Sequence, residues 1–261
     1  MTEARTGAPV VSTDAGPAPL PTVWDVPPKL APRATVLLLP GRGEDPLVYE
    51  RFGRRLAADA YPVRVLADPS RRPEEAAAQV RAALAETGLP GPVVLAGSDA
   101  GALFAVGLAA SGEVAVDALV LAGLPVQAAV EPQATGWEDE LATRTACPTH
   151  RGRLAEPGRV APGALFNPLP REWYERADLS KVTVPVLGLH GTADPVSPLA
   201  VVRSAYAAAP HAELVSLADG RHDAFNDISH RTGAATVVLF LERLRQGGGL
   251  APIAVNEQLW P

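Results

Sequence analysis

Short apolar runs alternate with amphipathic segments along most of the chain. Five apolar runs are bounded by Pro, Gly or Asp and suit strands buried on both faces: Thr35–Leu39, Val63–Ala67, Val93–Ala96, Ala118–Leu121 and Val184–Leu189. Other segments have helical spacing and plausible caps: Tyr49–Ala58, Pro73–Thr87, Gly101–Ala110, Pro198–Ala209 and Asp227–Arg245. This alternation predicts an α/β fold, with a mostly parallel sheet covered by helices on both faces.

The alternation stops between Leu124 and Thr183. This proline-rich stretch is too long for a bare connection in a compact domain, so we interpret it as a small cap insertion at about 126–182. Both ends of the chain are unpatterned. We therefore expect one domain over 22–246, with tails at 1–21 and 247–261.

Composition narrows the class of function. The chain has 261 residues, enough for one large core, and its net charge of −6 has the wrong sign for binding nucleic acid or an anionic membrane surface. No apolar run is long enough to insert into a membrane, and the first residues do not resemble a secretion signal. We therefore expect a cytoplasmic protein with a small-molecule substrate, whose oligomeric state is not predicted.

Cysteine usage bears on metals and on redox chemistry. The chain has one cysteine, Cys147, which excludes an internal disulfide and a cysteine metal cluster. We expect this thiol to be inert. We also expect neither a metal ion nor an organic cofactor.

The most informative segment runs from Val93 to Ala102. An apolar strand leads into Gly97-Ser98-Asp99-Ala100-Gly101 and then directly into a helix. Small residues two before and two after one position are what a nucleophile elbow requires, because its central residue has a strained backbone. In this frame the central residue is Asp99. Shifting the frame by one residue, to Ala96 and Ala100 as the small flanks, would make Ser98 the nucleophile instead.

These residues resemble the α/β-hydrolase superfamily, and the resemblance runs from about Thr22 to Arg245. The lysophospholipase and monoacylglycerol-lipase-like branch is most similar in layout. In that branch the acid follows a late strand, in a motif matched here by His190-Gly191-Thr192-Ala193-Asp194. The catalytic histidine follows the last strand, in a motif matched by Gly220-Arg221-His222. The resemblance implies a triad of Asp99, Asp194 and His222 in the superfamily's chain order. We expect these side chains to converge at the carboxyl ends of the strands, although Asp194 could instead cap a helix near Pro198.

An aspartate at the elbow resembles the haloalkane dehalogenases and epoxide hydrolases. In those families a carboxylate attacks an sp3 carbon, and water activated by a histidine then hydrolyses the alkyl-enzyme ester. Ala100 and Arg42 stand where dehalogenases have a Trp and a halide-binding Asn, and the cap offers Tyr174 as an acid donor. The resemblance therefore implies a hydrolase with an Asp nucleophile, epoxide-hydrolase-like before dehalogenase-like.

Three alternatives stay open. The scaffold could serve a non-hydrolytic lyase, isomerase or epimerase of secondary metabolism, a serine-type esterase using Ser98, or a non-catalytic protein that binds a ligand. Two carboxylates flanking His222 should raise the pKa of its imidazole. This would leave His222 a poor base until Asp99 is alkylated or protonated.

Further residues are candidates for the oxyanion hole and for the lining of the substrate pocket. The main-chain N–H groups of Arg42, in the Gly41-Arg42-Gly43 loop, and of Ala100 could form the oxyanion hole. We expect the Arg42 side chain to be solvated, or alternatively to anchor a substrate carboxylate. Trp137, Trp173 and Tyr174 could line the substrate pocket or pack the cap onto the domain. Of the other histidines, we expect His190 to be structural. We expect the remaining three to be surface or capping residues: His150, His211 and His230.

Overall fold

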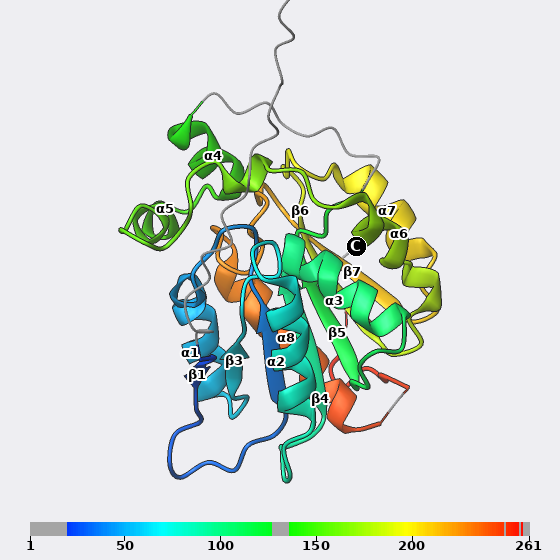
Figure 1. Ribbon diagram of the computed structural model, residues 1–261. Helices are drawn as coiled ribbons and strands as arrows, with labels where there is room; N and C mark the ends of the chain where they lie inside the picture. The colour runs from blue at the N-terminus through cyan, green and yellow to red at the C-terminus, as the bar shows by residue number, and fades with distance from the viewer. Residues whose placement is uncertain (1–19, 127–135, 248, 256, 258–261) are drawn as a thin grey trace, which may run out of the picture.

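A mixed sheet forms the centre of the molecule (Figure 1). The structure is a computed structural model that describes residues 20–126, 136–247, 249–255 and 257. In these residues seven strands form one sheet in the order β1-β3-β2-β4-β5-β6-β7, and every neighbouring pair is parallel except β1 with β3. The strands are β1 (Thr22–Trp24), β2 (Thr35–Leu39), β3 (Val63–Val65), β4 (Val93–Ser98), β5 (Ala118–Ala122), β6 (Val186–Gly191) and β7 (Ala212–Leu217).

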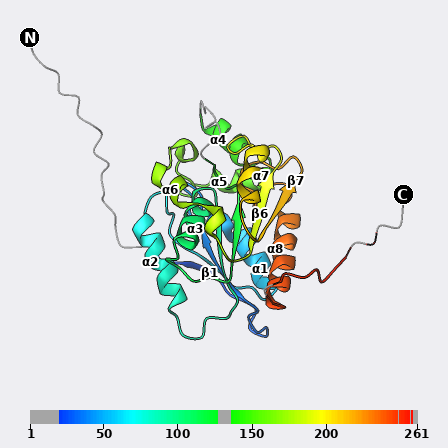
Figure 2. The same cartoon turned by 90° about the vertical axis from the view of Figure 1, so that its right-hand side faces the viewer.

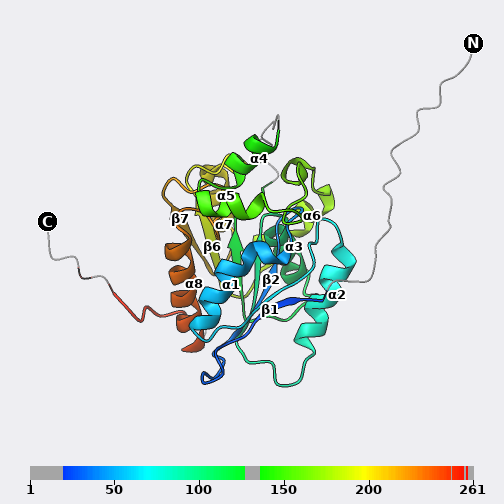
Figure 3. The same cartoon turned by 90° about the vertical axis from the view of Figure 1, so that its left-hand side faces the viewer.

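Helices cover both faces of this sheet, as the alternating pattern predicted (Figures 2 and 3). On one face, α1 (Glu50–Ala58) and α8 (His230–Arg245) bury Phe52 and Phe240 in a shared apolar cluster. On the other face lie α2 (Pro73–Leu84), α3 (Ala100–Ala110) and α7 (Leu199–Ala207). The central strands are buried on both sides, which explains why their sequences are continuously apolar instead of alternating.

The segment between β5 and β6 contains several short helices. They are α4 (Trp137–Arg144), α5 (Pro148–Leu154), η2 (Ala164–Phe166), α6 (Arg171–Arg176) and η3 (Leu179–Lys181), while η1 (Pro46–Tyr49) precedes α1. Helices α4 and α5 lie beyond the carboxyl ends of the strands, where the chain was expected to form a cap (Figure 1). Helix α6 packs beside α3, with the rings of Trp173 and Phe104 4.8 Å apart.

Several element boundaries differ from the sequence expectations. The antiparallel edge strand β1 was not predicted, because three residues carry too little pattern, and α8 begins at His230 instead of Asp227. The expected N-terminal tail lies outside the described residues except at 20 and 21, as does part of the expected C-terminal tail. Among the described helices, none combines the length and the apolar character needed to cross a bilayer.

Candidate active site

The turn between β4 and α3 places Asp99 at a strained position. Its backbone has φ 48° and ψ −120°, in the left-handed half of the map that a residue with a side chain seldom adopts. The flanking glycines are sterically required, because a Cβ on Gly97 would lie 2.4 Å from the Gly101 carbonyl carbon and one on Gly101 would lie 2.1 Å from the Leu39 oxygen. The elbow geometry is therefore at Asp99. Ser98 belongs to β4, and its hydroxyl hydrogen-bonds to Tyr49.

His222 lies between two aspartates. Its Nε2 is 3.1 Å from Asp99 Oδ1, and its Nδ1 is 2.9 Å from Asp194 Oδ2. The three residues follow β4, β6 and β7 at the carboxyl edge of the sheet, and all are buried. The structure thus brings together the three residues that the sequence singled out. Asp194 also accepts the Val196 and Ser197 amides through Oδ1, so it orders its own turn as well.

Arg42 contacts both carboxylate oxygens of Asp99. Its main-chain N–H and its Nε–H donate to Asp99 Oδ2, at 3.0 and 2.9 Å, while Nη2 donates to Oδ1 at 2.9 Å. Nη1 donates to the Asn167 carbonyl, 2.7 Å away. Arg42 is only 3% exposed, so the expectation of a solvated loop arginine was wrong. The physical reason is that a carboxylate buried at the elbow needs a buried counter-charge.

The two predicted oxyanion amides have different surroundings. The Arg42 N–H points to Asp99 Oδ2, as described above. Ala100 is the first residue of α3, so its N–H belongs to the first turn, where amides have no acceptor within the helix. The oxyanion role of Arg42 and Ala100 stays a prediction.

The charged groups around Asp99 shift one another's pKa values and favour the ionised forms. Burial alone would raise the pKa of Asp99, but the positive charges of Arg42 and His222 hold it well below its usual range. Burial alone would lower the pKa of His222, but Asp194 and Asp99 together raise it to about 10. His222 is therefore an imidazolium at neutral pH, as its position between two carboxylates predicted. Asp99, Asp194, His222 and Arg42 then form a buried cluster of two negative and two positive charges.

A second buried charge cluster contacts the loop that carries Arg42, because Arg144 donates to the Arg42 carbonyl. Arg144 of α4 binds Glu44 Oε1 at 2.7 Å and Glu140 Oε1 at 2.8 Å, and the phenol of Tyr49 donates to Glu44 Oε2. Burial is the main cause that raises the pKa of Glu44 to about 7, against the lowering effect of Arg144. Sequence reasoning missed these residues. The spacing of Glu140 and Arg144, four residues apart on a helix, was the available signal.

His150 and Cys147 occupy positions that the sequence did not predict. His150, expected at the surface or at a cap, is 3% exposed and its Nε2 contacts Asp223 Oδ2, next to His222. Cys147 is buried directly before α5, and the Arg51 guanidinium lies 3.6 Å from its sulfur. No group of three or more His, Cys, Asp or Glu side chains within the described part of the chain could hold a metal ion.

Of the three aromatic candidates for the substrate pocket, one lines a cavity large enough for a small molecule. Trp173 packs against Phe104 and lines a cavity of about 10 Å³, which is too small for a substrate. Trp137, the first residue of α4, packs against the apolar cluster that α1 and α8 share. Tyr174 differs from them. It lines a cavity of about 330 Å³ with Leu103 and Leu124.

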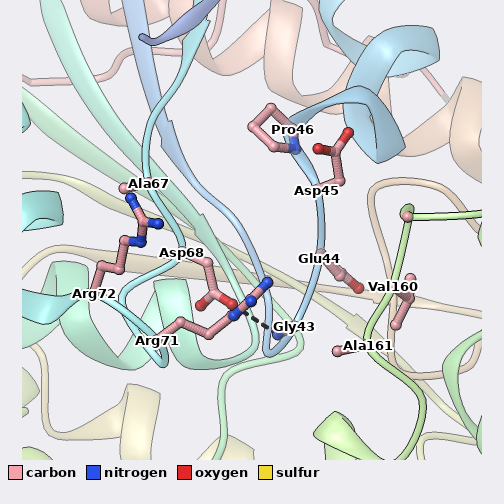
Figure 4. A pocket seen from close by; sticks show the side chains of 11 residues that line it. Gly43, Glu44, Asp45, Pro46, Ala67, Asp68, Arg71, Arg72, Val160 and Ala161 are labelled. Atoms are coloured by element: carbon pink, nitrogen blue, oxygen red, sulfur yellow. Dashed lines mark hydrogen bonds between the residues drawn. The ribbon is translucent and has the colours of Figure 1, made fainter. Parts of the chain in front are cut away.

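A further cleft, of about 310 Å³, lies beside the chain at 43–46 (Figure 4). Gly43, Asp68, Arg71 and Arg72 line it together with the chain around Val160. Asp68 Oδ2 accepts the Gly43 N–H at 2.8 Å, which is the dashed line in Figure 4. Burial raises the pKa of Asp68 to about 6.

Solved structures resemble this chain, whereas no protein-family model and no curated protein sequence matches it. The monoacylglycerol lipase of Paleococcus ferrophilus is 16% identical, with a TM-score of 0.68 over 87% of this chain and 98% of that chain. A monoglyceride lipase from Saccharomyces cerevisiae is 15% identical, with a TM-score of 0.60 over 87% of this chain and 89% of its own. A thermophilic esterase from Thermogutta terrifontis is 17% identical, with a TM-score of 0.60 over 86% and 94%. At these identities the similarity establishes the fold.

Proposed function

We propose that this protein, which has the α/β-hydrolase fold, is a hydrolase that opens a small, partly apolar substrate through an alkyl ester of Asp99, with epoxides preferred to haloalkanes. One observation carries the proposal. Asp99 Oδ1 faces His222 Nε2, whereas Oδ2 is held by two donors of Arg42. The carboxylate thus has one oxygen directed to the proton-transfer group and one directed to fixed positive dipoles.

The first step forms the ester. Oδ1 attacks an sp3 carbon of the epoxide, the carbon–oxygen bond of the ring breaks, and the ring oxygen takes the electron pair and one proton. The Arg42 Nη2 bond to Oδ1 has to open for this attack. Esterification removes the charge of Asp99, which is one of the two carboxylates that raise the pKa of His222. The imidazolium then releases one proton, and this release balances the proton taken up by the ring oxygen.

The second step hydrolyses the ester. Neutral His222 takes a proton from water, and the resulting hydroxide attacks the carboxyl carbon of Asp99. Negative charge develops on Oδ2 in the tetrahedral intermediate. Two donors already aimed at this oxygen, the Arg42 N–H and Nε–H, would stabilise that charge without rearrangement. The bond between the carboxyl carbon and Oδ1 then breaks, and the product leaves with the former Oδ1, which takes the second water proton from the new carboxyl group of Asp99. Asp99 is again a carboxylate, and His222 remains the imidazolium formed when it took the first water proton.

Mass spectrometry of the intact protein tests the intermediate. The His222→Ala variant is incubated with a panel of epoxides, haloalkanes and activated esters. We expect a mass increase equal to the whole epoxide, or to the alkyl group of a haloalkane. Peptide mapping should assign the added mass to Asp99. Labelling of Ser98 by an organophosphonate probe would instead favour a serine hydrolase.

A single turnover in 18O-water tests the second step in the native enzyme. Because water attacks the carboxyl carbon, the first product should be unlabelled and the Asp99 peptide should carry the label. Label in the first product, with Asp99 unlabelled, would rule out the alkyl ester. His222 would then act as a base on water or on the substrate.

A ligand-binding protein without turnover is the second candidate function. It is favoured by the burial of Asp99 and by the pairing of both its oxygens with Arg42. The Asp99→Asn variant separates the two candidates. A binder would keep its affinity for a ligand found in the same panel, whereas the enzyme would lose the covalent step because an amide is a poor nucleophile.

A further inference from the structure

The orientation of the Arg42 N–H depends on the peptide groups on either side of it. On the side before it, the Gly41 N–H donates to Glu44 Oε2 at 3.1 Å and to the Tyr49 hydroxyl at 3.0 Å. On the side after it, the Arg42 carbonyl accepts from Arg144 Nη2 at 2.9 Å. The Arg42 N–H belongs to the planar peptide group between these two, so holding both neighbours restricts the rotation of that group and the directions in which the N–H can point.

The residue that holds this carbonyl belongs to the cap. Arg144 is the last residue of α4, 100 residues from Glu44 in the sequence, and its guanidinium binds Glu44 Oε1 at 2.7 Å. It is 1% exposed. Glu140, one turn earlier, fixes the other edge of the guanidinium at 3.1 and 2.8 Å. The position of Arg144 relative to the Arg42 loop is therefore set by buried charge pairs and not by a flexible surface contact.

The same turn of α4 also contacts the loop that carries His222. The Asp223 N–H donates to the Arg144 carbonyl at 2.8 Å, and the His222 N–H donates to the Thr143 carbonyl at 3.3 Å. One helix end thus contacts both partners of Asp99, the Arg42 side and the His222 side. In Figure 1, α4 lies over the carboxyl edge of the sheet, in the position that these contacts require.

We propose that Arg144 and Glu44 are positioning residues, which hold the Arg42 N–H against Asp99 and make the geometry of the charge cluster depend on the docking of α4. As part of catalysis this role rests on the function proposed above, since the amide they orient is the one that would stabilise the oxyanion. As a structural role it can be measured without turnover.

The Glu44→Gln and Arg144→Lys variants test the proposal by amide hydrogen exchange in the full-length protein. Gln keeps an acceptor for Gly41 but loses the charge, and Lys keeps the charge but has a single nitrogen where Arg144 spans Glu44, Glu140 and the Arg42 carbonyl. We expect exchange of the Arg42 amide to accelerate by about tenfold or more in each variant, with the Leu95 amide in β4 unchanged. The matched control is Arg151→Lys on α5, whose ion pair with Glu138 is solvent-exposed.

Either of two results would overturn the proposal. Unchanged exchange at Arg42 in both variants would mean that the pair does not orient this amide. Equal acceleration at Arg42 and Leu95 would mean that it only stabilises the whole domain. If turnover is found, kcat should fall in both variants with KM nearly unchanged. If the native protein shows no turnover with any substrate class, the proposed function fails, but the exchange result still decides the positioning role.

Discussion

Arg42 holds Asp99 with its main chain and its side chain at once. The N–H and Nε–H donate to Oδ2 at 3.0 and 2.9 Å, and Nη2 donates to Oδ1 at 2.9 Å. A single residue therefore neutralises the elbow carboxylate and also directs a main-chain donor and a side-chain donor at its Oδ2. This pairing keeps a buried carboxylate ionised. Under the function proposed above, the Nη2 bond to Oδ1 has to open before Oδ1 can react.

Removing the Arg42 guanidinium should strongly destabilise the protein. Arg42→Met leaves Asp99 buried without its counter-charge, and we expect a loss of about 3 to 5 kcal/mol in the free energy of unfolding, measured by urea denaturation. The control is Arg171→Met, which breaks an exposed ion pair with Glu175 and should change that free energy by less than about 0.5 kcal/mol. Equal losses in the two variants would show that the Asp99 pair contributes no more than a surface contact.

Stability should fall at alkaline pH because of His222. Its pKa is raised from the ordinary 6.5 to about 10 in the folded protein. Below about pH 6.5 both folded and unfolded states hold the proton and the stabilisation is complete; between about pH 6.5 and 10 only the folded state holds it, so the stabilisation is progressively lost. Across this pH window the unfolding free energy should fall by a total on the order of a few kcal/mol.

The measurement is the unfolding free energy at a series of pH values across that window. In the His222→Gln variant the unfolding free energy should decline less as the pH rises. In the control variant His211→Gln, at an exposed position, it should decline as in the native protein. A native protein whose stability rises steadily over this window would contradict the assignment of His222 as a buried imidazolium.

Substitutions at the elbow should distinguish its two polar residues. Asp99→Asn should reduce turnover of any accepted substrate by about 1,000-fold or more, because the nucleophile is lost. Ser98→Ala should keep most of the activity, since Ser98 lies in β4 and its hydroxyl contacts Tyr49 of η1. Steady-state kinetics on both variants provide the comparison. The opposite pattern, with Ser98→Ala inactive and Asp99→Asn active, would reverse the assignment.

The elbow glycines should be intolerant of a single methyl group. A Cβ on Gly101 would lie 2.1 Å from the Leu39 carbonyl oxygen, which is main chain and has little room to move. We expect Gly101→Ala to cost about 3 kcal/mol of unfolding free energy. Gly152→Ala is the control because a Cβ there meets open space within α5, and it should be neutral or stabilising by up to about 1 kcal/mol. Thermal unfolding of both variants checks the difference.

Local sequence signals were sufficient where the physical constraint is local. The glycines at 97 and 101 are needed within a few residues of the strained Asp99, so the elbow could be predicted from spacing alone. Continuous apolar runs likewise identified strands buried on both faces. Periodicity was less informative in the cap, whose helices of six to eight residues are too short to establish a pattern.

The sequence by itself thus determined the α/β architecture and the elbow at Asp99. The resemblance to the α/β-hydrolase superfamily added Asp194 and His222, and with them the expectation that two carboxylates would keep His222 charged. Tertiary structure alone decided which charges are buried together. Arg42 was expected to be solvated or to anchor a substrate carboxylate, and His150 to be a surface or capping residue. Instead, Arg42 is buried against Asp99 and His150 against Asp223. The physical reason is that a polar or charged side chain is buried only where the fold supplies a partner, and these partners lie 57 and 73 residues away in the chain. No pattern of neighbouring residues carries that information.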